Sequence, residues 1–557
     1  MLNYFKIICF LIPFIGFSQR EIKPENLSPK DFTYWDVSKK KVQSAGCYYL
    51  DGKGDNKEKH GKWSFYDKYG TVEEVRNYYR NRLNGQVTLL YPNGKLKQEG
   101  YFKMGLQDSI YREWNENNTL SKEGMFELDR PKGIWKQFYI DGRERSLEEE
   151  IDSITYIRAF WLSDPKHTQT VIDGNGELTI FHTTGTIKEW YNYKNGRPNG
   201  PFEERSIYGY NLLTGAFIDG EKEGEWKYYY YTGEVEKTST YKNGVLNGPY
   251  NYYYDKNRTN VTGNYLEGKK EGLWKWFTNS GSPDMQGTFV KDLQEGEWIY
   301  SYPTGEKSYT AHYLKGLKSG TWDYIYKDGS KFKKGDFLND LKEGKWQTWY
   351  ENGTLLMDGN YEKGKEEGEW KNYWDDGKLK NSVAFKHGEM NGAWSSFSPN
   401  GHPTITGFYK QNIKSGKWIE YFENGLPKEQ ISYKVKDVKT KMDYGYMKGH
   451  TVKESIKQGH YISYSNKDFK RVEEGNYKND KKEGEWIDYY PLGKMPAVFT
   501  TYKNGELNGP MRQYDRMGKI SSEINYSKGL KDGKFIIYGE NGKIINEKNF
   551  SKGIETR

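Results

Sequence analysis

The sequence contains little of what usually holds a protein of its length together. Only two of its 557 residues are cysteines, Cys9 and Cys47. Cys9 falls in an apolar run that we expect to be removed, so Cys47 has no partner and a disulfide framework is excluded. Hydrophobic residues make up 34% of the chain, and aromatic residues account for half of that share, which leaves too few aliphatic side chains for several ordinary cores.

Clustered charge and clustered chemistry are also scarce. The formal net charge is +8, and acids and bases alternate throughout, whereas a nucleic-acid site needs a concentrated basic stripe. The eight histidines are dispersed, without a metal-ligand spacing. Carboxylates recur just before a tryptophan, as at Glu223, Glu295 and Glu367, and a repeated position is more typical of a solubilising residue beside a turn than of a general acid. We therefore expect no enzyme, no cofactor, no metal and no nucleic-acid partner.

One long apolar run is present, at the start of the chain. Lys6 precedes it, and it extends from Ile7 to Phe17. Residues 1–19 are therefore predicted to be a secretory signal peptide that is cleaved near Gln19, and their ending resembles signal peptides of Bacteroidota. The run is too short to cross a membrane as a helix, so we expect no transmembrane span.

Aromatic residues, by contrast, are abundant and recur at a fixed period. Between Trp274 and Trp418 a tryptophan returns every 24 residues, which indicates a repeat array. Conservative replacements at this position, which we call the Trp site, extend the array to 19 units, with Ile110 at the Trp site of one. The tryptophans predicted to form a structural ladder are Trp63, Trp135, Trp226, Trp274, Trp298, Trp322, Trp346, Trp370, Trp394, Trp418 and Trp486.

Each unit carries further fixed positions. A glycine stands two residues before the Trp site in nearly every unit, and another stands seven residues after it, with Asn117, Asn257 and Asp468 as the replacements. These residue types tolerate positive φ, so both positions are predicted to be turns. An aromatic residue three positions after the Trp site should lie on the opposite face of a strand, and a second strand returns with Tyr or Phe. One unit is therefore predicted to be one β-hairpin.

This pattern resembles a known repeat family. The segment Glu343-Gly344-Lys345-Trp346, followed by Tyr350, Asn352-Gly353 and Tyr361 to Gly364, is similar to a MORN repeat in the longer bacterial variant often labelled antitoxin-like. The resemblance implies an all-β fold, an elongated single-layer antiparallel sheet of tandem hairpins. It also implies a scaffold or adaptor. An antitoxin role fits poorly with the predicted export.

The period also predicts the domain organisation. The predicted segments are a signal peptide at 1–19, an N-terminal cap at 20–60, repeats at 61–143, an insertion at 144–175, repeats at 176–433, an insertion at 434–458, and repeats with a C-terminal cap at 459–557.

The two insertions are the places where the period is broken, and we expect them to be surface loops at one edge of the array. The first is acidic and aromatic, and the second is basic. A partner that must be recognised specifically is more simply bound at such breaks than on a repeating surface. The candidate docking residues are Tyr156, Phe160, Trp161, Lys436, Lys439 and Lys441.

Two functions from different classes are consistent with these features. The first is a non-enzymatic scaffold for protein partners in the bacterial cell envelope, exported and periplasmic, and accessory to an outer-membrane secretion or gliding complex. The second is a carbohydrate-binding or peptidoglycan-binding repeat protein, because Gly-x-Trp-x-x-Tyr-Tyr hairpins also resemble cell-wall-binding repeats that seat glycans between aromatic rings.

Overall fold

A computed structural model describes residues 27–50, 57–255, 258–439, 451–491 and 494–556. These residues form 45 strands and no helix, so none of them belongs to a helix that could cross a membrane. The chain divides into two compact units, Met1–Asn257 and Arg258–Arg557, and each is described separately. In both units consecutive strands pair antiparallel, except that β26 pairs with β24 and β37 pairs with β35, and this confirms the predicted all-β fold of tandem hairpins.

The first unit contains 19 strands. They are β1(Asp31–Tyr34), β2(Val42–Leu50), β3(Lys57–Tyr66), β4(Val72–Tyr79), β5(Arg82–Leu90), β6(Leu96–Lys103), β7(Leu106–Trp114), β8(Leu120–Glu127), β9(Arg130–Phe138), β10(Glu144–Ile151), β11(Ile154–Trp161), β12(Gln169–Ile172), β13(Asn175–Phe181), β14(Ile187–Lys194), β15(Arg197–Arg205), β16(Asn211–Ile218), β17(Glu221–Tyr229), β18(Val235–Lys242) and β19(Val245–Tyr253).

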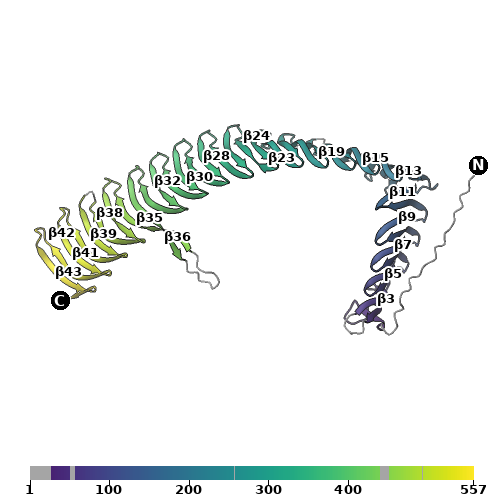
Figure 1. Ribbon diagram of the computed structural model, residues 1–557, viewed down its shortest axis with the longest axis horizontal. Helices are drawn as coiled ribbons and strands as arrows, with labels where there is room; N and C mark the ends of the chain where they lie inside the picture. Colours follow the sequence, from purple (N-terminus) through teal and green to yellow (C-terminus); the bar gives the residue numbers. More distant parts are fainter. Residues whose placement is uncertain (1–26, 51–56, 256–257, 440–450, 492–493, 557) are drawn as a thin grey trace, which may run out of the picture. The chain divides into compact units, whose positions relative to one another are not determined.

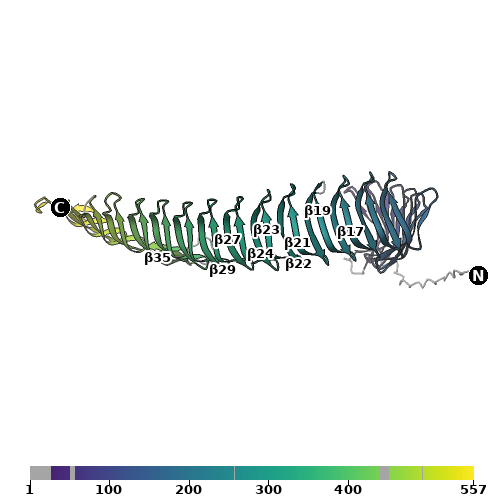
Figure 2. The same ribbon diagram turned by 90° about the horizontal axis from the view of Figure 1, so that it is seen from above.

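The second unit contains the remaining strands, of which β21 to β35 lie side by side in Figures 1 and 2. They are β20(Thr259–Leu266), β21(Lys269–Phe277), β22(Pro283–Val290), β23(Leu293–Ser301), β24(Lys307–Leu314), β25(Leu317–Lys318), β26(Gly320–Ile325), β27(Lys331–Leu338), β28(Leu341–Trp349), β29(Leu355–Glu362), β30(Lys365–Tyr373), β31(Leu379–Lys386), β32(Glu389–Phe397), β33(Pro403–Lys410), β34(Ile413–Tyr421), β35(Pro427–Lys439), β36(Thr451–Lys457), β37(Gly459–Tyr464), β38(Arg471–Lys478), β39(Lys481–Tyr489), β40(Pro496–Lys503), β41(Glu506–Tyr514), β42(Ile520–Ser527), β43(Leu530–Tyr538), β44(Ile544–Ser551) and β45(Ile554–Thr556).

Two kinds of turn alternate along the chain. The longer turn falls where the sequence predicted it: in the unit of Trp346, the Gly353 amide donates to the Tyr350 carbonyl, and Gly353 has φ +83°. The other turn has only two residues, both with positive φ, as at Lys363 (+50°) and Gly364 (+80°). Such mirror-image turns match the twist of the strands that they join, so the hairpins continue into one another as a meander.

The glycine two residues before the Trp site is not in a turn, which corrects the prediction. Gly344 lies inside β28 with φ +63°, at a β-bulge. Asp336 of β27 pairs with Glu343 of β28, and Lys334 pairs with Gln347. Between these two pairs β27 has one residue, Gly335, whereas β28 has three, Gly344 to Trp346. A bulge and a turn both favour glycine, since both need a left-handed residue.

The bulge creates the place that the tryptophan occupies. The Trp346 indole lies directly over Gly335, where a Cβ atom would come within 2.1 Å of the ring. Its Nε1 donates a hydrogen bond of 3.1 Å to the Asp336 carbonyl, which stands at the register jump. The side chain is only 1% exposed. One residue therefore fills the bulge with apolar surface and also satisfies a backbone acceptor.

This contact recurs through both units with two exceptions, at Trp322, where Ala311 takes the place of the glycine, and at Trp394. Ten of the eleven ladder tryptophans are buried, and the glycines that lie under indoles include Gly124, Gly215, Gly263, Gly287, Gly359, Gly407 and Gly475. Trp394 is only half-buried. At the equivalent of Gly335 it faces Val383, with which it pairs directly, so the valine side chain occupies the space that an indole would fill.

Aromatic rings of the two strands alternate on the same face as the tryptophans. In the second unit the rings from Tyr265 to Phe385 contact one another edge to face in an unbroken series, with centroids 4.9 to 6.1 Å apart. The series is Tyr265, Trp274, Phe289, Trp298, Tyr313, Trp322, Phe337, Trp346, Tyr361, Trp370 and Phe385. In three units of this series a lysine four residues before the Trp site covers the rings, as Lys342 does at 4.8 Å from Trp346 and 4.5 Å from Tyr361.

The structure corrects one Trp site. Ile110 does not occupy it, because Tyr111 is the residue that pairs with Gly124 and contacts the Trp135 ring. The spacing between Val87, Tyr111 and Trp135 is therefore a uniform 24 residues. The bulge residue of this unit is Ser109, with φ +70°.

The contact of tryptophan with glycine predicts a sharp difference between two glycine substitutions. Gly335→Ala should destabilise the β27–β28 hairpin by about 1–3 kcal/mol, because the new methyl group must displace the Trp346 indole. Hydrogen exchange should accelerate in β27 and β28 before distant hairpins. Gly344→Asn is the matched control, since the nearest atom to its Cβ position is Asp336 Oδ2 at 4.0 Å, an ordinary contact distance, and asparagine tolerates this φ. Unchanged protection in the Gly335→Ala protein would contradict this account.

Candidate docking sites

The first break in the period does not form the expected loop. Strand β11 pairs with β10 through Leu147 and Ala159, and β12 pairs with β11 through Phe160 and Val171. The segment is therefore a shortened hairpin of the sheet, with Ala159 at its Trp site. Because β12 has only four residues, the turn at Asn195 and Gly196 fills the gap beside β11, and the Ile157 amide donates to the Gly196 carbonyl at 2.9 Å.

This hairpin has its own small core. Phe160, Val171 and Leu178 are buried together, with Ile157 and Tyr193 packed against them. Phe160 is 3% exposed. It is therefore a core residue, and its nomination as a docking residue was wrong.

The other two candidates of this hairpin are partly exposed but are not brought together. Tyr156 lies near the start of β11 with the Arg158 guanidinium 5.1 Å from its ring, and Trp161 is the last residue of the strand. The Trp161 ring stacks on His167, with centroids 5.9 Å apart. Of the two, Trp161 is therefore the one that belongs to the loop at the end of the hairpin.

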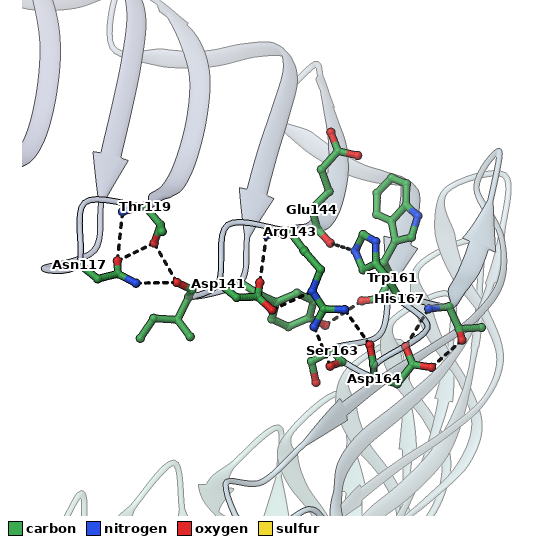
Figure 3. Close-up of polar contacts among 12 residues, drawn as sticks. Asn117, Thr119, Asp141, Arg143, Glu144, Trp161, Ser163, Asp164 and His167 are labelled. Carbon is green, nitrogen blue, oxygen red and sulfur yellow. Dashed lines mark hydrogen bonds and ion pairs between the residues drawn. The ribbon is translucent and has the colours of Figure 1, made fainter.

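That loop, residues 162–168, is fixed to the preceding turn (Figure 3). The Arg143 guanidinium donates to the carbonyls of Asp164 (2.8 Å) and Ser163 (3.0 Å) and pairs with Asp141. His167 Nε2 lies 2.6 Å from the Glu144 carbonyl. The loop is thus a rigid surface feature, in which side chains bond the backbone of the neighbouring turn.

The second break is of a different kind, because its strands leave the sheet. Strand β35 continues beyond its pairing with β34 and pairs with β36, from Tyr433 with Lys457 to Lys439 with Thr451. Figure 1 shows this hairpin, here called the ribbon, projecting from the sheet. Lys434 pairs with Ile456, and the residues at the same positions of a regular unit, such as Glu362 and Lys365, enclose a two-residue turn. Residues 435–455 therefore replace the two residues of that turn.

The ribbon carries charged, solvent-facing side chains. Lys436 is exposed and stands opposite Glu454, and Asp437 stands opposite Lys453, whose Nζ is 2.6 Å from Gln411 Oε1. Ser455 Oγ also donates to the Lys414 carbonyl at 2.9 Å, which attaches the base of the ribbon to the preceding hairpin. Lys439 ends β35, and Lys441 lies outside the described residues.

A third break, which we did not predict, forms a pocket. The Trp sites Tyr461, Trp486 and Met511 are 25 residues apart, so two consecutive units have one extra residue. The positive φ falls on Phe469 (+54°) and not on Asp468, and the Phe469 ring stacks on Tyr464 at 4.9 Å. The lining residues of this cavity of about 380 Å³ are Tyr464, Phe469, Lys470, Arg471, Tyr489 and Lys494. The irregular spacing was the signal that could have revealed it.

Asn117 and Asn257 were the other two residues predicted to take the place of the glycine in the longer turn. In the unit of Tyr111 the positive φ (+72°) belongs to Asn118, which stands seven residues after the corrected Trp site, and not to Asn117. Asn257 lies outside the described residues.

The repeated carboxylates have a structural role that the sequence did not reveal. Glu343 Oε2 accepts a hydrogen bond of 2.8 Å from the backbone amide of Lys363, the first residue of the next two-residue turn. Glu223, Glu295 and Glu367 make the same contact with the following turns. Consecutive turns are therefore tied together. Among the described residues no group of three or more His, Cys, Asp or Glu side chains is placed to hold a metal ion.

The glycan alternative rested on the resemblance to hairpins that seat a sugar between aromatic rings, and in the cluster around Tyr309 the rings cover one another. Tyr300 and Tyr309 stack at 4.2 Å with an interplanar angle of 9°, and Tyr309 stacks on Tyr324 at 5.0 Å. A sugar ring needs a free aromatic face. In this cluster the faces are used for packing between neighbouring strands.

The comparison with protein families finds a similar repeat in part of the chain. Six segments match the family described as MORN repeat variant: residues 83–104, 222–243, 342–363, 366–387, 414–434 and 531–552. The segment 342–363 begins four residues before the Trp site and ends in a two-residue turn, so it corresponds to β28 and β29. No curated protein matches the chain.

Similar solved structures come from toxin complexes. TcdB2-TccC3 without its hypervariable C-terminal region is 9% identical with a TM-score of 0.12, and the match covers 92% of this chain and 34% of that one. TcdB2-TccC3 itself is 9% identical, with a TM-score of 0.10 and coverages of 92% and 35%. The Photorhabdus luminescens Tc holotoxin pore is 10% identical, with a TM-score of 0.11 and coverages of 92% and 34%. The chain thus spans about a third of the length of these structures.

The tyrosine cluster predicts sensitivity to alkali. Burial, with a smaller contribution from Tyr300 and Tyr324, raises the pKa of Tyr309 to about 12. An unfolded tyrosine titrates near pH 10. The folded protein therefore holds this proton more tightly, so its contribution to stability is complete below about pH 10 and is lost as the pH rises toward 12. The melting temperature of the native protein should fall as the pH rises through this window. The melting temperature of the Tyr309→Phe protein should fall less steeply over the same window. An equal slope in both proteins would count against this assignment.

Proposed function

We propose that this protein is a non-enzymatic scaffold, in which regular hairpins present irregular elements to protein partners. The observation that carries the proposal is the ribbon formed by residues 435–439 and 451–455. In regular units such as that of Trp346 a two-residue turn, Lys363 and Gly364, is sufficient to join neighbouring hairpins, so the fold does not require these additional residues. Long additions to a turn are tolerated, but here the addition is an ordered pair of strands.

The ribbon has the properties of a protein-binding element. In the ribbon, β35 and β36 pair with each other, and their outer edges offer backbone groups to which a partner strand can add. The charged pairs on its surface oppose uncontrolled addition of strands. They also give a partner a mixed pattern of charge to recognise. The matches to the MORN repeat variant and the rigid loop at 162–168 are consistent with the same role.

We place this scaffold in the bacterial cell envelope, as an accessory of an outer-membrane secretion or gliding complex. The support for export is the charged start and apolar run of residues 1–19, which lie outside the described part of the structure. The carbohydrate-binding alternative is less well supported, because the clustered tyrosine faces are covered by one another.

The ribbon can be removed without altering the register. Replacing residues 435–455 by Asn-Gly retains the pair of Lys434 with Ile456 and restores a two-residue turn. We expect the same circular dichroism spectrum as the native protein and loss of at least one specific partner when the protein is crosslinked and purified from its own organism.

The matched control for the ribbon is Lys363→Asn, which creates an Asn-Gly turn in a regular hairpin and should retain every partner. If the protein without the ribbon retains the same partners as the native chain, the ribbon is not the binding element, and the rigid loop at 162–168 becomes the element to test next.

Export predicts a processed protein. The mature chain, isolated from its organism and sequenced from its N-terminus, should begin near Arg20 and be recovered from the periplasmic fraction. An intact Met1 in a cytoplasmic fraction would refute the proposed location but would leave the scaffold proposal to the ribbon experiment.

A further inference from the structure

A row of aliphatic side chains lies along the edge of the second unit where the two-residue turns are. Each of these residues directly precedes or follows a two-residue turn and is between 42% and 54% exposed. We call the row the edge stripe, and its members are Leu266, Val290, Leu293, Leu314, Leu317, Leu338 and Leu341. They belong to strands β20 to β28, which can be followed in Figure 1.

The fold itself does not require aliphatic residues at these positions. The residues on either side of a two-residue turn pair across the hairpin, as Leu314 does with Leu317. At the next two turns after the stripe the same pair is Glu362 with Lys365 and Lys386 with Glu389. Equivalent hairpins therefore form with oppositely charged residues in this place.

The distribution of the aliphatic pairs is also not random. Among the described two-residue turns, both residues are aliphatic in three consecutive turns of the stripe and otherwise only at Ile151 and Ile154. The remaining turns carry at least one polar or charged residue. A row of exposed aliphatic side chains on one edge of a sheet indicates contact with another apolar surface.

We propose that the edge stripe is the interface through which two copies of this chain associate in antiparallel orientation. The hairpins advance by two strand spacings, roughly 10 Å. A second copy presents apolar residues at this same interval, so two of the three apolar pairs meet each other in register and the third meets Leu266. A twofold axis between the turns at Lys291 and Lys315 places Leu314 and Leu317 against Val290 and Leu293 of the second copy, and Leu338 and Leu341 against Leu266.

The charges of the turns fit this arrangement. Exposed Lys315 then faces the turn that contains Asp292, and exposed Asp340 faces Lys269, at the start of β21. Lys291 lies beside Asp292, and Glu267 lies in the turn that precedes Lys269, so each of these two opposing segments has no net charge. No two opposing segments therefore carry net charge of the same sign, which favours this register over one that places Lys315 against Lys315.

The test is sedimentation velocity of the full chain over a range of concentrations. The native protein should pass from one chain to two with a micromolar dissociation constant, as is typical of small interfaces. Leu314→Glu combined with Leu317→Lys reproduces the pair found at Glu362 and Lys365. It should weaken association at least about tenfold, because the new charges would be buried against Val290 and Leu293 of the second copy.

Two further variants make the test decisive. Leu338→Glu changes a different turn of the stripe and should weaken association as well, which guards against a folding defect specific to the first variant. Ile151→Glu with Ile154→Lys makes the same chemical change outside the stripe and should leave association unchanged. A native protein that sediments as one chain at every concentration, or stripe variants that associate as tightly as the native chain, would overturn the proposal.

Discussion

An indole lying over a glycine of the adjacent strand is the contact on which the sheet depends. A single-layer sheet has no second layer to cover its apolar face, so its stability has to come from neighbours within the layer. The bulge at Gly344 shifts Trp346 until its ring covers Gly335, and the ring then donates to the Asp336 carbonyl. One side chain therefore provides both buried apolar surface and a hydrogen bond to the backbone. The sheet consequently needs few aliphatic side chains for its stability.

The other regular features follow from this contact. The ring of Tyr361 reaches Trp346 and Trp370 edge to face, and Lys342 covers the resulting aromatic surface. Glu343 lies between that lysine and the bulge, and its carboxylate accepts a hydrogen bond from the Lys363 amide in the next turn. Lys-Glu-Gly before the tryptophan is therefore a structural signature, with each residue bonded to a different part of the neighbouring hairpin.

The fold could be predicted from the sequence because the same hairpin pattern recurs many times at a fixed interval. Three features of the structure could not be predicted in this way. Bulges and turns favour the same residues, so Gly344 could not be assigned without knowledge of the facing strand. The glycine under each indole belongs to the preceding unit, and Ala311 and Val383 interrupt its recurrence. Insertions of equal length had different outcomes, because the first contributes Phe160 and Val171 to a core and the second carries exposed charge.

The position of the glycine has a consequence for how the array is divided. The hairpin that recurs in the sequence contains β28 and β29, yet the indole of β28 rests on β27, and the glycine of β29 supports β30. The self-contained module is thus the pair of strands joined by the short turn, half a hairpin out of phase with the sequence repeat. Chimaeras and shortened arrays should accordingly be cut within the longer turns, where every tryptophan keeps the surface on which it lies.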